Sequence, residues 1–126
     1  MEKSPLQVEK VLIVEGRTDK EQVERVLQEP VQIICTQGSY DMERLEEEIL
    51  PFEGAELYIL VDADEAGNKL RQQLKRELPN AKHLYTRKMY GEVACTPLSY
   101  LAKILADAHF LVRSEHLQGN HGFNRS

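Results

Sequence analysis

The sequence has few cysteines and no long apolar run, and these absences exclude several classes of protein. Its two cysteines, Cys35 and Cys95, lie far apart, which excludes a cysteine-rich zinc ribbon and a disulfide framework and leaves only a single bridge open. We expect both to be small buried hydrophobic residues. No apolar run approaches the ~20 residues of a membrane helix, and the first ten residues lack the apolar core of an export signal. We therefore expect a cytoplasmic protein that does not enter a membrane.

Length and composition indicate one compact domain. The chain has 126 residues, of which 41% are hydrophobic and 29% are charged, and these values are typical of a globular protein. There is no internal repeat and no linker rich in glycine, proline or serine. We expect a single domain over residues 1–113, followed by a polar tail over residues 114–126 that frays.

Charge is divided unequally along the chain. The net charge is −5, but residues 1–68 contain 6 Lys/Arg and 17 Asp/Glu, whereas residues 69–126 contain 10 Lys/Arg and 4 Asp/Glu. Such asymmetry is expected of an acidic site beside a basic docking surface. The simpler interpretation is a solvated acidic helix face, because four glutamates crowd residues 43–48. That interpretation accounts less well for the excess of basic residues in residues 69–126.

Short apolar runs alternate with helical patterns. Buried strands are predicted at 11–14, 31–35 and 57–61, and a more polar strand at 82–86. Helices are predicted to begin at four places: a capping box of Thr18 and Glu21, Asp41, the residues after Gly67, and Thr96-Pro97. This alternation predicts an α/β fold, a compact three-layer sandwich with a mostly parallel central sheet of about four strands.

Acidic residues follow two of these strands. Glu15 follows the first, and Asp62 and Asp64 follow the third. Ligands of open α/β sheets bind beyond the carboxyl ends of the strands, so the three carboxylates meet if the first and third strands are neighbours. Such a group repels itself without a cation. Mg²⁺ accepts carboxylate oxygens and keeps positions for water and phosphate, so we expect Glu15, Asp62 and Asp64 to bind Mg²⁺, with Mn²⁺ as a substitute.

Each acidic motif alone also has an ordinary structural explanation. Asp64 can cap the following helix, and an Asp-x-Asp sequence is common in turns. The joint placement of both motifs, each between a strand and a helix, favours a functional site. Gly16 and Gly67 agree with it, because a backbone that approaches phosphate closely favours glycine.

The stretches VLIVEGRTD and LYILVDADEAG resemble the Toprim domain of topoisomerases, bacterial primases, OLD-family nucleases and the ribonuclease that matures 5S ribosomal RNA. The resemblance spans residues 10–105 and implies a Rossmann-like fold with a four-stranded parallel core. It also implies that Glu15 acts as a general acid or base, that Asp62 and Asp64 bind Mg²⁺, and that Asp19 supports catalysis.

Within this family the chain is most similar to the small ribosomal-RNA maturases. The similarity rests on three short segments, Thr36–Ser39, Gly67–Arg71 and Lys82–His83. A departure from the family is Ala66, which stands where topoisomerases have a third acid. We therefore expect one principal metal.

The acidic site predicts Mg²⁺-dependent phosphodiester chemistry on nucleic acid, RNA or DNA. The resemblance implies a nuclease of the maturase type, with a ribosomal RNA precursor as one candidate substrate. Basic residues would hold the flanking phosphates. They are Lys69, Arg71, Lys82, Arg87 and Lys88. The alternative is a non-catalytic Toprim-like module that binds nucleic acid or a partner protein. A phosphatase or receiver domain fits less well, because those folds place a reactive Asp or an acid cluster after the first strand.

Overall fold

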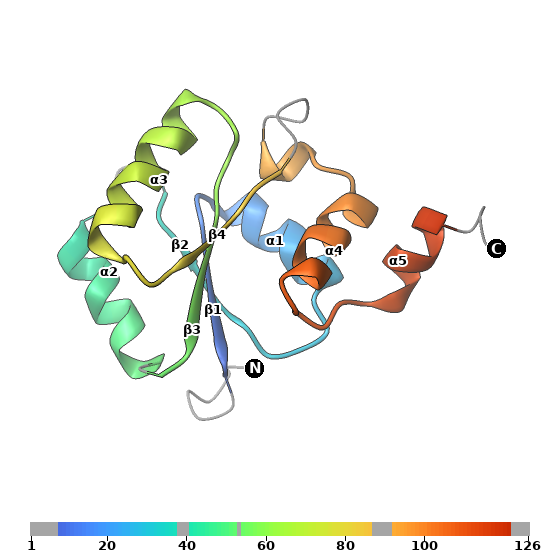
Figure 1. The fold of residues 1–126 in the computed structure, drawn as a ribbon, viewed down its shortest axis with the longest axis horizontal. Coiled ribbons are helices and arrows are strands. Elements are labelled where there is room, and N and C mark those ends of the chain that lie inside the picture. The colour runs from blue at the N-terminus through green and yellow to red at the C-terminus, as the bar shows by residue number, and fades with distance from the viewer. Residues whose placement is uncertain (1–7, 38–40, 53, 87–91, 122–126) are drawn as a thin grey trace.

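The computed structural model describes residues 8–37, 41–52, 54–86 and 92–121. Within these residues the centre of the fold is a parallel sheet with the strand order β2-β1-β3-β4 (Figure 1). The strands are β1 (Lys10–Val14), β2 (Gln32–Cys35), β3 (Glu56–Leu60) and β4 (Lys82–Leu84). The predicted α/β fold with a four-stranded parallel sheet is therefore confirmed.

Helices cover both faces of the sheet, as the three-layer prediction requires. In the described part of the chain they are α1 (Arg17–Val26), α2 (Met42–Ile49), α3 (Glu65–Glu77), α4 (Leu98–Asp107) and α5 (Ser114–His121), with the short 3₁₀ turns η2 (Leu50–Phe52) and η4 (Val93–Cys95). Helices α1 and α4 lie on one face, and α2 and α3 lie on the other (Figure 1). None of the described helices has the length and apolar character needed to cross a membrane.

Strand β1 shows why its sequence is a continuous apolar run. Leu12 and Val14 pack toward α1 and α4, whereas Val11 and Ile13 pack toward α2 and α3. All four side chains are fully buried. Successive side chains of a strand point to opposite faces, so a strand covered on both faces needs an apolar residue at every position.

Helix α1 begins earlier than the sequence predicts. Gly16 is its N-cap, and the Gly16 N–H donates to Asp19 Oδ2 at 3.0 Å. The predicted capping box of Thr18 and Glu21 is therefore wrong, because the chain passes directly from β1 into the helix and Asp19 supplies the acceptor. Helix α4 begins at Leu98, one residue later than predicted.

The polar segment after residue 113 is helical where the structure describes it. Residues 114–121 form α5, which packs against α4, and Nε2 of His116 lies 3.2 Å from the carbonyl oxygen of Arg25. The prediction of a frayed tail is wrong for these residues. Their own sequence has little amphipathic pattern, so contacts with α1 and α4 stabilise the helix.

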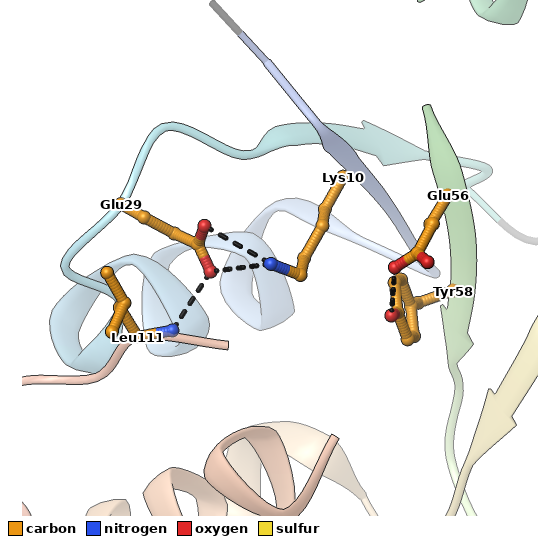
Figure 2. A network of polar contacts seen from close by, with 5 residues as sticks. All are labelled: Lys10, Glu29, Glu56, Tyr58 and Leu111. Carbon is orange, nitrogen blue, oxygen red and sulfur yellow. Dashed lines mark hydrogen bonds and ion pairs between the residues drawn. The ribbon is translucent and has the colours of Figure 1, made fainter. Parts of the chain in front are cut away.

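Polar contacts fix the edge of the sheet at which β1 and β3 begin. The Glu29 carboxylate accepts hydrogen bonds from Lys10 Nζ at 3.3 Å and from the Leu111 backbone N–H at 2.9 Å (Figure 2). The Tyr58 hydroxyl donates to Glu56 at 2.7 Å, and burial together with this bond raises the pKa of Tyr58 to about 12. We call this edge the amino edge. The contacts of Glu29 at this edge join β1 to the segment that follows α4.

Candidate functional site

Strands β1 and β3 place two acidic motifs side by side. They pair directly, and β2 lies on the other side of β1. The connection after β1 leads to β2 on one side of β1, and the connection after β2 leads to β3 on the other side. The strand order therefore reverses between β1 and β3, which is the switch point where α/β sheets bind ligands. Glu15 and Asp62 follow the carboxyl ends of these strands. The adjacency on which the sequence prediction depended is present.

Glu15 and Asp62 are in direct contact although they lie 47 positions apart. Glu15 Oε1 accepts a hydrogen bond from the Asp62 backbone N–H at 2.9 Å, and the nearby Asp62 carboxylate raises the pKa of Glu15. The Asp62 carboxylate is held by a second contact, because its Oδ1 accepts a hydrogen bond from the Val93 backbone N–H at 2.8 Å. Val93 is fully buried in η4, so the turn before α4 holds Asp62 in place.

Asp64 is held by a helix cap. It is the N-cap of α3, and its Oδ1 accepts from the Gly67 N–H at 2.7 Å. The structural explanation of Asp64 is therefore confirmed. Its negative charge nevertheless raises the pKa of both Glu15 and Asp62.

Gly67 allows the chain to pass close to Asp62. A Cβ at this position would lie 2.0 Å from the Asp62 carbonyl oxygen and 3.1 Å from Asp64 Oδ1. The first contact is with backbone, which cannot move aside without displacing Asp62. Glycine is therefore required for the turn that presents the two aspartates.

The acidic groups disfavour one another's charge. Burial, together with the negative charges of Asp62 and Asp64, raises the pKa of Glu15 to about 6. Burial and neighbouring carboxylates also raise the pKa of Asp62 and of Asp19. A carboxyl group that holds its proton near neutral pH can serve as a general acid or base.

Asp19 lies behind this pair. Its side chain is 7% exposed and fixes the turn from β1 into α1 by accepting from the Gly16 N–H. The negative charges of Asp62 and Glu92 raise its pKa further. Asp19 therefore positions the turn that carries Glu15. The structure also brings Glu92 toward the site, from the turn that supplies the Val93 N–H.

The donor set suits a hard divalent cation. Mg²⁺ is commonly held by one or two carboxylates, with water and phosphate completing its coordination, and metal binding displaces protons from its ligands. The pKa of Glu15 and the pKa of Asp62 are both raised, so a bound cation would displace protons from these groups, and Asp64 adds a third carboxyl group. Among the described residues no three His, Cys, Asp or Glu side chains are already arranged around a metal position. The predicted set of Glu15, Asp62 and Asp64 is thus brought near but not preformed as a cage.

Arg71, which is predicted to bind a flanking phosphate, is buried. It is 6% exposed, and its Nη2 donates to the carbonyl oxygens of Val61 at 3.4 Å and Leu84 at 3.1 Å. Its Nη1 donates to Nδ1 of His83 at 3.1 Å. The guanidinium lies inside because the carbonyl groups at the ends of β3 and β4 accept its N–H groups.

Of the other predicted basic residues, the structure describes Lys69 and Lys82. Lys69 is exposed on α3. Lys82 begins β4 and forms an ion pair with Glu56 at 3.8 Å, so it lies toward the amino edge. Arg87 and Lys88 lie outside the described residues.

Residues 10–90 match the family model of the Toprim domain. This chain belongs to the Toprim family. It is 48% identical over 112 residues to the uncharacterized protein YusF of Bacillus subtilis (strain 168), a match that covers 89% of this chain and 77% of YusF. A solved structure of a small TOPRIM domain protein from Bacillus stearothermophilus is 54% identical, with a TM-score of 0.82 over 87% of this chain and 93% of that chain.

Family membership confirms the predicted small Toprim protein and implies a metal-binding fold related to nucleic acids. The particular resemblance to the ribosomal-RNA maturases stays a prediction.

Without metal, Glu15 makes the stability of this Toprim protein depend on pH. Its pKa is about 6 in the folded protein, against an ordinary value of 4.5 for an exposed glutamate, so the folded state binds more protons between these values. The stabilising contribution is complete below about pH 4.5 and is lost as the pH rises through about 6. Because the carboxyl group is half-exposed, solvent screening reduces the effect to roughly 1 kcal/mol. Thermal unfolding in EDTA should show this loss in the wild type and not in Glu15→Gln, and equal pH slopes would contradict the assignment.

Proposed function

We propose that this Toprim protein is a Mg²⁺-dependent nuclease. The observation that carries the proposal is the contact between Glu15, whose pKa is raised to about 6, and Asp62 at the switch point of the sheet. A structural ion pair would join opposite charges. Here like charges are held together, which costs stability and is typical of functional sites.

The residues divide into two roles in this proposal. Asp62 and Asp64 would hold Mg²⁺, or Mn²⁺ in its place, and Glu15 would complete the acidic set. When bound, the cation supplies a Lewis acid at the phosphodiester group. Glu15 takes a proton from the attacking water or gives one to the leaving oxygen. The Val93 N–H and Asp19 hold the two strand ends in position.

The proposed substrate is nucleic acid, and the similarity to the maturases makes a ribosomal RNA precursor the first to test. Lys69 is exposed in α3, one turn after the Asp64 cap, where it would contact a flanking phosphate. Such contacts give salt-dependent affinity that is independent of sequence. We accordingly expect binding to weaken steeply as salt increases.

A cleavage assay on labelled RNA and single-stranded DNA tests the proposal. Wild type is compared in Mg²⁺, Mn²⁺ and EDTA with Asp62→Asn, which keeps an oxygen to accept from the Val93 N–H. Loss of an electrostatic group from a phosphoryl-transfer site lowers the rate by about 10²–10³-fold. We expect that loss in Asp62→Asn and in EDTA.

The matched control is Glu65→Gln, which removes an exposed acid from the first turn of α3. Its cleavage rate should equal that of the wild type. Equal residual cleavage by all three proteins would show a contaminating nuclease and reject the proposal. Tight binding without cleavage by any of them would instead favour the non-catalytic binding module.

A further inference from the structure

Tyr85 presents an exposed aromatic ring at the same edge of the sheet as the acidic site. It follows β4, and 57% of the residue is exposed. The guanidinium carbon of Arg71 lies 4.2 Å from its ring centre. One face of the ring is therefore covered by a cation, and the exposed area belongs to the other face and the ring edge. Such a ring can accept another planar group by stacking.

The support beneath the ring is rigid. Arg71 is buried, and its N–H groups are fixed by the carbonyl oxygens of Val61 and Leu84 and by His83. A long side chain held by several hydrogen bonds has little rotamer freedom left to lose. A ligand that stacks on Tyr85 therefore meets a preorganised surface.

The same guanidinium joins this surface to the acidic site. Arg71 contacts the carbonyl oxygen of Val61, and Val61 immediately precedes Asp62. Strand β4 pairs with β3 up to Leu84, so Tyr85 follows the carboxyl end of the strand next to the one that carries Asp62. A nucleic-acid strand bound along this edge of the sheet would therefore pass both Asp62 and Tyr85.

A hollow of about 410 Å³ beside Tyr85 has the lining that a base requires. It lies between β4 and α4, and its aromatic and aliphatic lining residues are Leu84, Tyr85, Tyr100, Ile104 and Ala108. In Figure 1, β4 lies between α3 and α4. The acid that also lines the hollow, Asp107, forms an ion pair with Lys103 at 3.6 Å.

Charge distinguishes between two candidate ligands of this hollow, a nucleic acid and a second copy of the chain. The positive charges of Arg71 and Lys75 act on His83, which lines the hollow and lies under Arg71. Residues 69–126, which supply most of α3 and all of β4 and α4, carry the excess of basic residues. Nucleic acid, a polyanion, is attracted to the charges of Arg71 and Lys75 beside the hollow, whereas a symmetric contact with a second copy of this chain would bring these like charges closer together.

We infer that Tyr85 and the hollow between β4 and α4 form a stacking site for an unpaired base of single-stranded nucleic acid. The inference rests on the proposed function and narrows its substrate to strands with an unpaired base beside the reacting phosphate. The base stacks on the outer face of Tyr85 while Arg71 supports the inner face. Duplex nucleic acid offers no free base face and binds through its phosphates alone.

The absence of tryptophan from the sequence allows a direct test. Tyr85→Trp introduces a single fluorophore, which is titrated with short oligouridylate and oligodeoxythymidylate in EDTA so that no turnover occurs. We expect quenching by stacking. The matched control is Leu111→Trp, at a residue 64% exposed on the amino edge, which should not be quenched. In anisotropy titrations Tyr85→Ala should bind about tenfold more weakly than wild type, and Tyr85→Phe should bind normally.

The outcomes separate the two proposals. Equal quenching of both tryptophans, quenching by an abasic sugar-phosphate oligomer, or an emission change with protein concentration alone would overturn the stacking site. The last result would identify a second copy as the occupant. Cleavage by wild type without quenching of Tyr85→Trp rejects the stacking site and leaves the nuclease proposal. Quenching without cleavage supports the stacking site and rejects nuclease activity.

Discussion

Replacing Gly67 with alanine should destabilise the protein by about 3 kcal/mol, although alanine is the better helix former by about 1 kcal/mol. The added Cβ would lie 2.0 Å from the Asp62 carbonyl oxygen and 2.8 Å from the Asp62 carbonyl carbon. Both are backbone atoms, so relief requires movement of the turn from Asp62 to Asp64. We expect the melting temperature to fall by roughly 10 °C. Variant protein that remains folded should show weaker Mg²⁺ binding, because the two aspartates move together with that turn.

Gly16→Ala is the matched control for this substitution. Gly16 also lies between a strand and a helix, but a Cβ there would meet only Asp19 Oδ2, at 3.9 Å, and its backbone is extended at φ −142°. We expect its unfolding free energy to change by less than about 1 kcal/mol. Thermal and denaturant unfolding measure both variants. Equal effects would mean that the close approach at Gly67 does not limit stability.

Glu15→Gln should lower the cleavage rate by about 10²–10⁴-fold while substrate binding is retained. Glutamine has the same shape and keeps an oxygen that can accept from the Asp62 N–H, a bond of 2.9 Å in the wild type. It cannot gain or lose the proton that Glu15 exchanges near pH 6. Single-turnover kinetics with saturating protein would isolate this chemical step from binding.

Glu21→Gln is the control for the loss of one negative charge, because Glu21 is exposed on α1, the helix that follows Glu15. It should cleave at the wild-type rate. If Glu15→Gln kept its rate within a few fold of the wild type, the proton-transfer role would be rejected, and Glu15 would serve only to bind metal or shape the turn.

Much of the fold could be predicted because β1 and β3 are covered on both faces. Their apolar runs, such as Val11–Val14, stand out without any structural information. The start of α1 could not be predicted from the same rules. Gly16 has no side chain to mark it as a cap, and the acceptor, Asp19, acts from inside the helix.

The contact between Glu15 and Asp62 could be predicted because it depends only on strand order. The environment of Arg71 could not. Arg71 lies beside the inward-facing Leu70 and Leu74 on α3, where a long side chain can turn either to solvent or inward. The carbonyl oxygens of Val61 and Leu84 decide the direction, and they belong to other parts of the chain.

The backbone N–H of Val93 could not be identified either. Its bond to Asp62 joins residues 31 positions apart and involves no side chain of Val93. A sequence pattern registers side-chain chemistry, whereas this contact is made by a main-chain group that every residue except proline possesses. It depends on how η4 packs under the end of β3.

The amino edge has a consequence for how the molecule opens. Glu29 links Lys10 to the Leu111 N–H, and backbone bonds join Gln28 to Leu111 and Val26 to Arg113. Release of the Leu111 amide must therefore break several contacts at once, as part of a larger cooperative unit. Among the residues that the structure describes, the turns at the other end of the sheet make no hydrogen bond to the segment after α4. Backbone amides at that end of the sheet can exchange hydrogen through small local fluctuations. The turns that carry the acidic residues can therefore adjust to a bound nucleic-acid strand while α4 and α5 stay attached to α1.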